Sequence, residues 1–175
     1  MARFLGRMMG AALLRSEAYE EVEADRHATW QAFVVVVLSA LCLGVGDSTT
    51  TGPSGIPWSV LHDVILWYVW AFVTWWVGTR WLPTGATVAD PGQLLRTIGF
   101  SSAPGILRIF MLIPVLAGPV FVVCTLWMLA SMVVAVRQAL DYCGTRRAIM
   151  VCAIGFPVYA VGLLVSVLLL GPWPV

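Results

Sequence analysis

The chain has 175 residues, of which 60% are hydrophobic and only 11% are charged. This apolar share is well above the roughly 45–50% of a typical soluble domain, so the composition excludes an ordinary soluble protein. The formal net charge of +1 excludes the concentrated basic surface on which nucleic-acid binding depends, and no nucleic-acid partner is expected.

Residues 1–28 are predicted to form a cytoplasmic amphipathic segment. On a helix, the apolar side chains near the amino terminus share one broad face, and they are Phe4, Leu5, Met8, Met9, Ala12 and Leu13. Arg3, Arg7 and Arg15 lie elsewhere on that helix, which suits a helix in the headgroup region with its basic side towards anionic lipid. A frayed tail is the alternative interpretation of this segment.

The one acidic cluster of the sequence lies between Tyr19 and Asp25. Asp25 is predicted to cap the first apolar helix, because a carboxylate accepts hydrogen bonds from the free amide groups of a first helical turn. Glu20, Glu21 and Glu23 have no such structural task, and an acidic cluster beside an anionic leaflet is repelled. We therefore expect these glutamates, with Tyr19 as an aromatic anchor, to form a partner-docking patch. A solvated spacer helix is the alternative.

Five apolar blocks of about 17 to 22 residues follow, and a bilayer core of about 30 Å needs about 20 helical residues. The blocks are Thr29–Val45, Trp58–Gly78, Phe100–Leu116, Val120–Val136 and Ile149–Leu170. Each block is long enough to cross the membrane once. The sequence therefore predicts an all-α, polytopic integral membrane helix bundle with five transmembrane helices plus amphipathic surface helices. Residues 29–175 are expected to form this five-span domain.

The arginines give the orientation of these spans. All basic residues are arginine, and all except Arg108 lie before the first block, between the second and third, or between the fourth and fifth. Positive loops stay cytoplasmic, so the amino terminus is expected inside and the carboxyl terminus outside. The arginine-free Ala117–Pro119 segment is interpreted as a tight outer turn. Basicity from arginine alone favours a GC-rich prokaryotic genome, and hence a multi-pass protein of the prokaryotic cytoplasmic membrane.

A helix start signal precedes the third block. Within Asp90–Gln93, an aspartate at the cap is followed by proline at the first helical position and by glutamine three residues after the cap. The short amphipathic helix Leu94–Ile98 should lie on the cytoplasmic surface. Gly99, Phe100 and Pro104 are then expected to break it where the chain turns into the third span, since glycine and proline interrupt helices.

Close helix packing is expected inside the bundle. Trp67 and Trp70 lie near the middle of the second block, where an indole usually packs between helices. Small residues four positions apart allow helices to approach closely, and such pairs are Ala40 with Gly44 and Ser131 with Ala135.

Charged residues within or beside the spans are candidate functional residues, because inserting one costs at least roughly 2.5–3.5 kcal/mol. Asp63 is expected near the outer surface, and Arg108 two to three turns into the third span from the cytoplasmic side. These depths differ too much for an easy ion pair. In one interpretation Asp63 reaches the outer headgroups and Arg108 extends towards the inner surface. If Arg108 is deeper, Asp141 is its nearest counter-ion, one turn beyond Arg137.

Three short motifs can be compared with known families, and they are Tyr19–Asp25 with Gln31-Ala32, Gly99–Pro104, and Arg137–Tyr142 with Arg147-Ala148. Together they resemble the Yip domain family of Ypt-interacting proteins, especially its short prokaryotic members. The resemblance implies a five-span membrane scaffold or adaptor with no known reaction. The chain lacks the long cytosolic amino-terminal region and the Asp-Leu-Tyr-Gly-Pro element of eukaryotic members, so their binding of Rab-type GTPases is not carried over.

The sequence contains none of the common catalytic, nucleotide-binding or metal-binding motifs, so no enzyme activity, cofactor or metal is expected. The predicted function is a non-enzymatic scaffold that organises membranes or assembles a membrane complex. Its expected partners are the lipid bilayer and other membrane proteins or further copies of itself, and no small-molecule substrate is identified. The alternative is a small transporter or channel component that uses the broken third span and Arg108.

Overall fold

The computed structural model describes residues 2–85, 87 and 89–170. The elements in chain order are α1 (Ala2–Ala12), α2 (Ser16–Ala24), α3 (Ala28–Gly46), α4 (Ser48–Thr51), α5 (Gly55–Arg80), α6 (Pro91–Ser101), the 3-10 helix η1 (Ala103–Leu112), α7 (Pro114–Ala139) and α8 (Thr145–Leu170). Every regular element in these ranges is helical, which confirms the all-α class.

Among the described residues, three helices are long and apolar enough to cross a membrane, judged by length and composition. They are α3, α5 and α7, and they contain the first, second and fourth apolar blocks. The fifth block lies in α8, which has 26 residues, the same number as α5 and α7. An apolar run of this length folds as a helix in lipid because a helix satisfies all its backbone hydrogen bonds internally.

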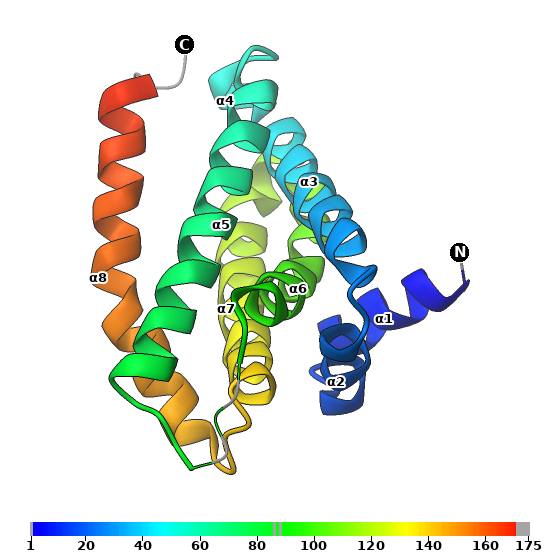
Figure 1. Ribbon diagram of the computed structural model, residues 1–175. Coiled ribbons are helices and arrows are strands. Elements are labelled where there is room, and N and C mark those ends of the chain that lie inside the picture. Colours follow the sequence, from blue (N-terminus) through cyan, green and yellow to red (C-terminus); the bar gives the residue numbers. More distant parts are fainter. Residues whose placement is uncertain (1, 86, 88, 171–175) are drawn as a thin grey trace.

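The segments that carry most of the arginines lie together at one end of the molecule (Figure 1). The α5–α6 and α7–α8 connections are at the bottom of this view, and the α1–α2 pair lies to the right in its lower half; we call this the arginine-bearing end. The short helix α4 and the last turns of α8 lie at the top, which we call the α4 end. Helix α3 runs towards the α4 end, α5 returns from it, and α8 runs towards it again.

The third apolar block does not form one helix. It is divided among the last residues of α6, all of η1 and the first turn of α7. The turn predicted at Ala117–Pro119 is wrong, because these residues lie inside α7. The chain reverses instead at Ile113, whose extended backbone (φ −89°, ψ 109°) leads into Pro114 at the start of α7. Proline suits that position, since the first helical residues need no amide donor.

The 3-10 helix η1 runs beside α3. A Cβ atom added to Gly99, just before η1, would lie 2.7 Å from the Cβ atom of Ala32 in the second turn of α3. At the other end, the carbonyl of Arg108 lies against Gly46, the last residue of α3. Ten residues of 3-10 helix rise about 20 Å, against about 15 Å for an α-helix, so a short segment follows most of α3.

Helix α6 begins as predicted but is not a surface helix. The Asp90 carboxylate accepts from the amides of Gly92 (2.6 Å) and Gln93 (3.1 Å), and the Gln93 side chain accepts from the amide of Asp90 (2.7 Å). Beyond this exposed first turn, side chains such as Leu94 and Ile98 are buried. The surface expectation fails because α2, α3, α5 and α7 all pack around this helix.

The expected close packing is confirmed at the centre of the bundle. Trp67 is buried, and its Nε1 donates to the carbonyl of Leu95 at 3.0 Å. Gly44 faces Ser59 of α5 at very short range, and the Ser59 hydroxyl donates to the carbonyl of Ala40 at 3.1 Å. A larger side chain at Gly44 would therefore separate α3 from α5.

Candidate functional site

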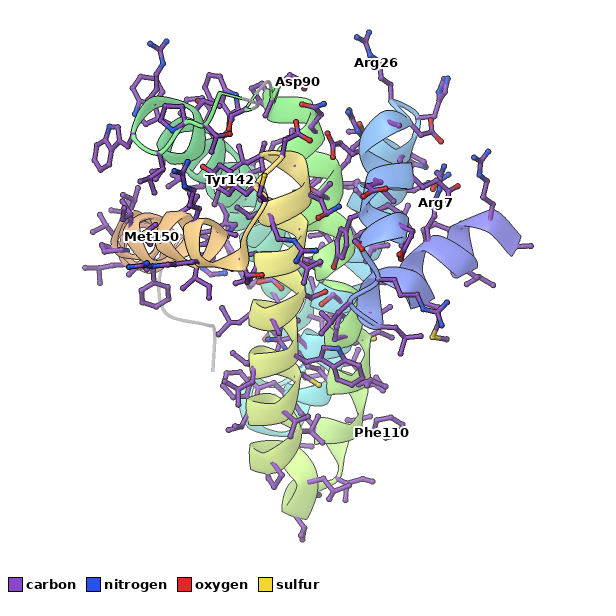
Figure 2. All side chains as sticks on the ribbon, turned by 90° about the horizontal axis from the view of Figure 1, so that it is seen from below. Arg7, Arg26, Asp90, Phe110, Tyr142 and Met150 are labelled. Carbon is purple, nitrogen blue, oxygen red and sulfur yellow. The ribbon has the colours of Figure 1, made fainter. Side chains whose placement is uncertain are left out.

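Polar side chains from five helices meet at the arginine-bearing end. The cluster joins α1 and α2 to α3, α6 and α7, and Figure 2 looks onto it from that end. We call it the junction, and its members are Arg7, Tyr19, Glu20, Glu21, Glu23, Asp25, Gln31, Gln93, Arg96, Ser131 and Gln138.

Arg7 is the most fully bonded member of the junction. Its Nε donates to Glu21 at 3.0 Å, its Nη2 to Asp25 at 2.8 Å and its Nη1 to the Gln31 side chain at 3.0 Å. Only 1% of the Arg7 side chain is exposed. The expectation that Arg7 faces anionic lipid is wrong, because α1 folds against α2 and two carboxylates replace the lipid phosphates as its partners.

The carboxylates beside Arg7 are held in their charged form. Hydrogen bonding to Arg3, and then to Arg7, lowers the pKa of Glu21. The pKa of Asp25 is lowered first by its bond to Arg7 and then by the amide of His27, which donates to Asp25 at 3.0 Å. The predicted cap is therefore corrected: the residue at the start of α3 is His27, and Asp25 binds one amide beside it.

Tyr19 is fully buried between α2 and α7. Its hydroxyl lies 2.6 Å from the Ser131 Oγ and donates to the carbonyl of Ala11 at 3.2 Å. Burial raises the pKa of the phenol, while the hydrogen bond with Ser131 acts in the opposite direction. Tyr19 is therefore no exposed anchor for a partner. The sequence-based expectation fails because the small residues of α7 let α2 pack directly over it.

Two further glutamates bond to the neighbouring helices. The Gln138 side chain donates to Glu20 at 2.8 Å, and the Gln93 side chain donates to Glu23 at 3.1 Å. Arg96 donates to the backbone carbonyl of Glu23 at 2.8 Å. Burial, and then the nearby charge of Asp141, raises the pKa of Glu23 to about 7. These contacts give the glutamates a structural task that the sequence did not reveal, although Glu20 also stays exposed.

The residues expected to break the third span lie at one boundary. Gly99 and Phe100 are still helical, and the helix type changes at Ser102, just before η1. Phe100 is buried, and its ring meets the ring of Phe4 edge-on with centroids 6.2 Å apart. Pro104 is buried at the start of η1. The break in the third apolar block therefore lies next to α1.

Arg137 and Asp141 lie at the arginine-bearing end. Arg137 donates through Nε to the Gln138 side chain at 3.2 Å, and Asp141 has a left-handed backbone (φ 52°) just after α7. The next residue, Tyr142, donates to the carbonyl of Leu82 at 2.8 Å. Asp141 is therefore not the counter-ion of Arg108, whose backbone lies at the α4 end.

A second polar cluster lies in a cavity of about 410 Å³ inside the bundle. Most of its wall is apolar or aromatic, and these residues are Val36, Leu66, Trp67, Trp70, Ile98, Met128, Leu129, Met132 and Phe156. Its polar lining residues are Ser39, Asp63, Ser101, Ser102, Arg108 and Thr125. Asp63 and Arg108, which were expected at different depths, both line this cavity.

Arg108 extends from η1 into this cavity and is 8% exposed. Its Nη2 donates to the Thr125 hydroxyl at 3.3 Å, and its guanidinium carbon lies 5.7 Å from the centre of the Phe121 ring. The Nε atom has no hydrogen-bond partner among the described residues, and the same holds for the Ser39 hydroxyl. Arg108 does not reach a surface of the bundle, as one interpretation of the sequence expected, because its side chain is buried and lines the cavity.

Among the described residues, the junction leaves one buried side-chain nitrogen without a hydrogen bond, the Nε of Arg96, whereas the cavity leaves both the Nε of Arg108 and the Ser39 hydroxyl without one. The described residues contain no group of three or more His, Cys, Asp or Glu residues that could hold a metal ion. The junction is built to fix helices relative to one another. In the cavity, the charged guanidinium of Arg108 lies beside apolar walls.

An all-α chain with apolar helices of membrane-spanning length, tied together by a polar junction, belongs among helical membrane proteins. Residues 11–169 match the family model of the Yip1 domain. The match covers most of the chain, so the protein belongs to the Yip1 domain family, as the motifs indicated. No curated protein and no solved structure matches the chain.

Proposed function

We propose that the protein is a non-enzymatic membrane scaffold or adaptor of the Yip type, which holds its amino-terminal helices as a fixed platform at the membrane surface. The observation that carries the proposal is the junction, in which Gln31 and every polar side chain of Tyr19–Asp25 bond within the chain. The outer side of α1 supports a surface position, since Leu5 and Met9 on this helix and Leu13 just after it are exposed.

The same proposal includes five crossings, with the amino terminus and the arginine-bearing end in the cytoplasm and the carboxyl terminus outside. The gathering of arginines at one end supports it. A phosphatase reporter fused after Val175 should be active outside the cytoplasm. A membrane-impermeant thiol reagent should reach Cys143, which is exposed at this end, only from the cytoplasmic face. A carboxyl terminus found inside would contradict the five-span arrangement.

A partner of the platform is proposed to be another membrane protein or a second copy of this chain, and Glu20 is its candidate contact. Glu20→Gln keeps a side chain able to bond Gln138, so folding should be unchanged. Chemical cross-linking in native membranes, followed by purification in mild detergent, should yield a complex of fixed stoichiometry for the wild type. The Glu20→Gln variant should lose that complex. An unchanged complex would remove Glu20 from the contact, and a monomer in both would contradict the adaptor role.

The cavity and the break before η1 favour one second candidate, a small transporter or channel component. Arg108 would then bind an anionic solute within the membrane. Solute uptake into vesicles that contain only this protein tests this directly. Uptake that requires Arg108 would favour transport over the scaffold, and tight vesicles would favour the scaffold.

A further inference from the structure

Arg108 is a buried cation that makes few hydrogen bonds and lines a cavity. Its side chain is more than nine-tenths buried, yet Nη2 makes one hydrogen bond of 3.3 Å and Nε makes none within the described part of the chain. A buried guanidinium with unused donors destabilises the fold, because water has been removed without full replacement. The planar donors of arginine match the oxygens of a phosphate or carboxylate. Arg108 is therefore placed to bind an oxyanion.

The rest of the cavity selects among ligands that carry an oxyanion. Asp63 also lines it, so a purely anionic group would meet a carboxylate as well as the guanidinium. A group with a phosphate and an amine would match both charges. Trp67 and Phe156 in the wall favour a positively charged amine further, because aromatic faces attract cations.

The apolar part of the cavity gives the remaining chemistry. Leu129 of α7 and Phe156 of α8 both line the cavity and are 43% and 56% exposed, so its rim reaches the outer surface of the bundle. That surface is apolar and suits lipid chains. A volume of about 410 Å³ lies within the usual range of small-ligand sites and is enough for a headgroup with the first part of a chain.

We propose that this cavity is a binding site for a zwitterionic phospholipid, whose phosphate is bound by Arg108 and whose amine faces Asp63. The Thr125 hydroxyl positions the guanidinium, and the free Ser39 hydroxyl supplies a further donor to the phosphate. The acyl chains leave past Leu129 and Phe156 into the bilayer. Phosphoethanolamine and phosphocholine lipids share this chemistry.

Native mass spectrometry tests the proposal after delipidation and incubation with an equal mixture of phosphatidylethanolamine, phosphatidylcholine and phosphatidylglycerol. Wild-type protein should retain one zwitterionic lipid in preference to phosphatidylglycerol. A preference for ethanolamine would identify hydrogen bonding to Asp63 as the selecting contact, and a preference for choline would identify the aromatic wall. Either result supports the site. Equal or stronger retention of phosphatidylglycerol would overturn it.

Substitutions then assign the two charges. Arg108→Met should reduce lipid retention by about tenfold or more, the loss expected for a charged hydrogen bond. Arg137→Met, which removes an arginine outside the cavity, is the matched control and should retain lipid as the wild type does. Asp63→Asn should shift retention towards phosphatidylglycerol.

Two results would overturn these assignments. The first is unchanged lipid retention by Arg108→Met. The second is failure of Arg108→Met to fold in any of the three lipids, because the guanidinium would then have a structural rather than a ligand-binding role. The lipid preference of the wild type and the shift in Asp63→Asn remain measurable in either case.

Discussion

Arg7 in the junction and Arg108 in the cavity are both buried, yet they differ in how completely their side chains are hydrogen-bonded. Arg7 donates to three side-chain partners at 3.0 Å or less, two of which are carboxylates. Arg108 donates to one hydroxyl at 3.3 Å and leaves Nε without a partner in the described residues. A buried cation that bonds through all three of its nitrogens stabilises the fold around it, whereas one that leaves a nitrogen unbonded costs stability until something binds.

The comparison separates two kinds of task within one small protein. Most polar groups of the junction form hydrogen bonds that hold α1 and α2 against the bundle, which suits a scaffold. The cavity keeps polar groups available beside apolar walls, which suits a ligand. Four substitutions, in order of expected effect, test this difference.

Arg7→Met should have the largest effect. It leaves Glu21 and Asp25 without their buried partner, and because both carboxylates still reach solvent we expect a loss of about 2–3 kcal/mol rather than the full cost of breaking a buried pair. Thermal melting in detergent measures it. Arg3→Gln is the matched control, since Arg3 bonds the same Glu21 but is 75% exposed, and it should leave the melting temperature nearly unchanged. Equal losses would mean that burial of Arg7 is unimportant.

Gly99→Ala should come next, because the new Cβ would lie 2.7 Å from the Cβ of Ala32 and would push α6 away from α3. Overpacking of this kind costs about 1–3 kcal/mol. Gly6→Ala and Gly118→Ala provide controls within helices, since a Cβ at either position meets nothing within 4 Å. These should be neutral or stabilising by up to about 1 kcal/mol, as alanine favours helix. Similar melting of all three variants would contradict close packing at Gly99.

Glu23→Gln should have a smaller effect that depends on pH. Burial raises the pKa of Glu23 from 4.5 to about 7, so the folded state binds more protons than the unfolded state between these values. The contribution of Glu23 to stability is therefore present below about pH 4.5 and is lost as the pH rises to about 7. At pH 8 the variant should be more stable than the wild type by about 1 kcal/mol, because the half-buried carboxyl is partly screened by solvent.

The melting temperatures of the wild type and Glu23→Gln should converge towards pH 5. Glu20→Gln, on the exposed side of the same helix, should melt like the wild type at both pH values. A difference between Glu23→Gln and the wild type that does not change with pH would show that lost packing, not charge, is responsible.

Local sequence patterns were sufficient for the long helices and for their simplest contacts. Continuous apolar runs identify α3, α5, α7 and α8, and the Asp90–Gln93 pattern marks the start of α6 because capping uses residues within one turn. Pairs of small residues and central tryptophans likewise predicted close packing. In each case the interacting residues are neighbours in sequence, or the property is one that a helix shows along its own length.

Contacts between distant segments could not be predicted in the same way. Arg7 has the spacing of a lipid-facing arginine, and only the fold of α1 onto α2 and α3 brings Gln31 to it. The apolar residues from Phe100 to Val136 run on almost without interruption, and two prolines, at 114 and 119, both resemble helix starts. The position of the turn at Ile113 therefore depends on the packing of η1 against α3. The same packing places the backbone of Arg108 at the α4 end.

The most direct test of the difference between junction and cavity is the melting temperature of Arg108→Met in lipid-free detergent, measured beside the wild type and Arg7→Met. Methionine removes an incompletely bonded cation and keeps an apolar side chain of similar length, so Arg108→Met should melt at or above the wild-type temperature. A fall as large as that of Arg7→Met would contradict the account, because Arg108 would then belong to the structural framework and not to a ligand site.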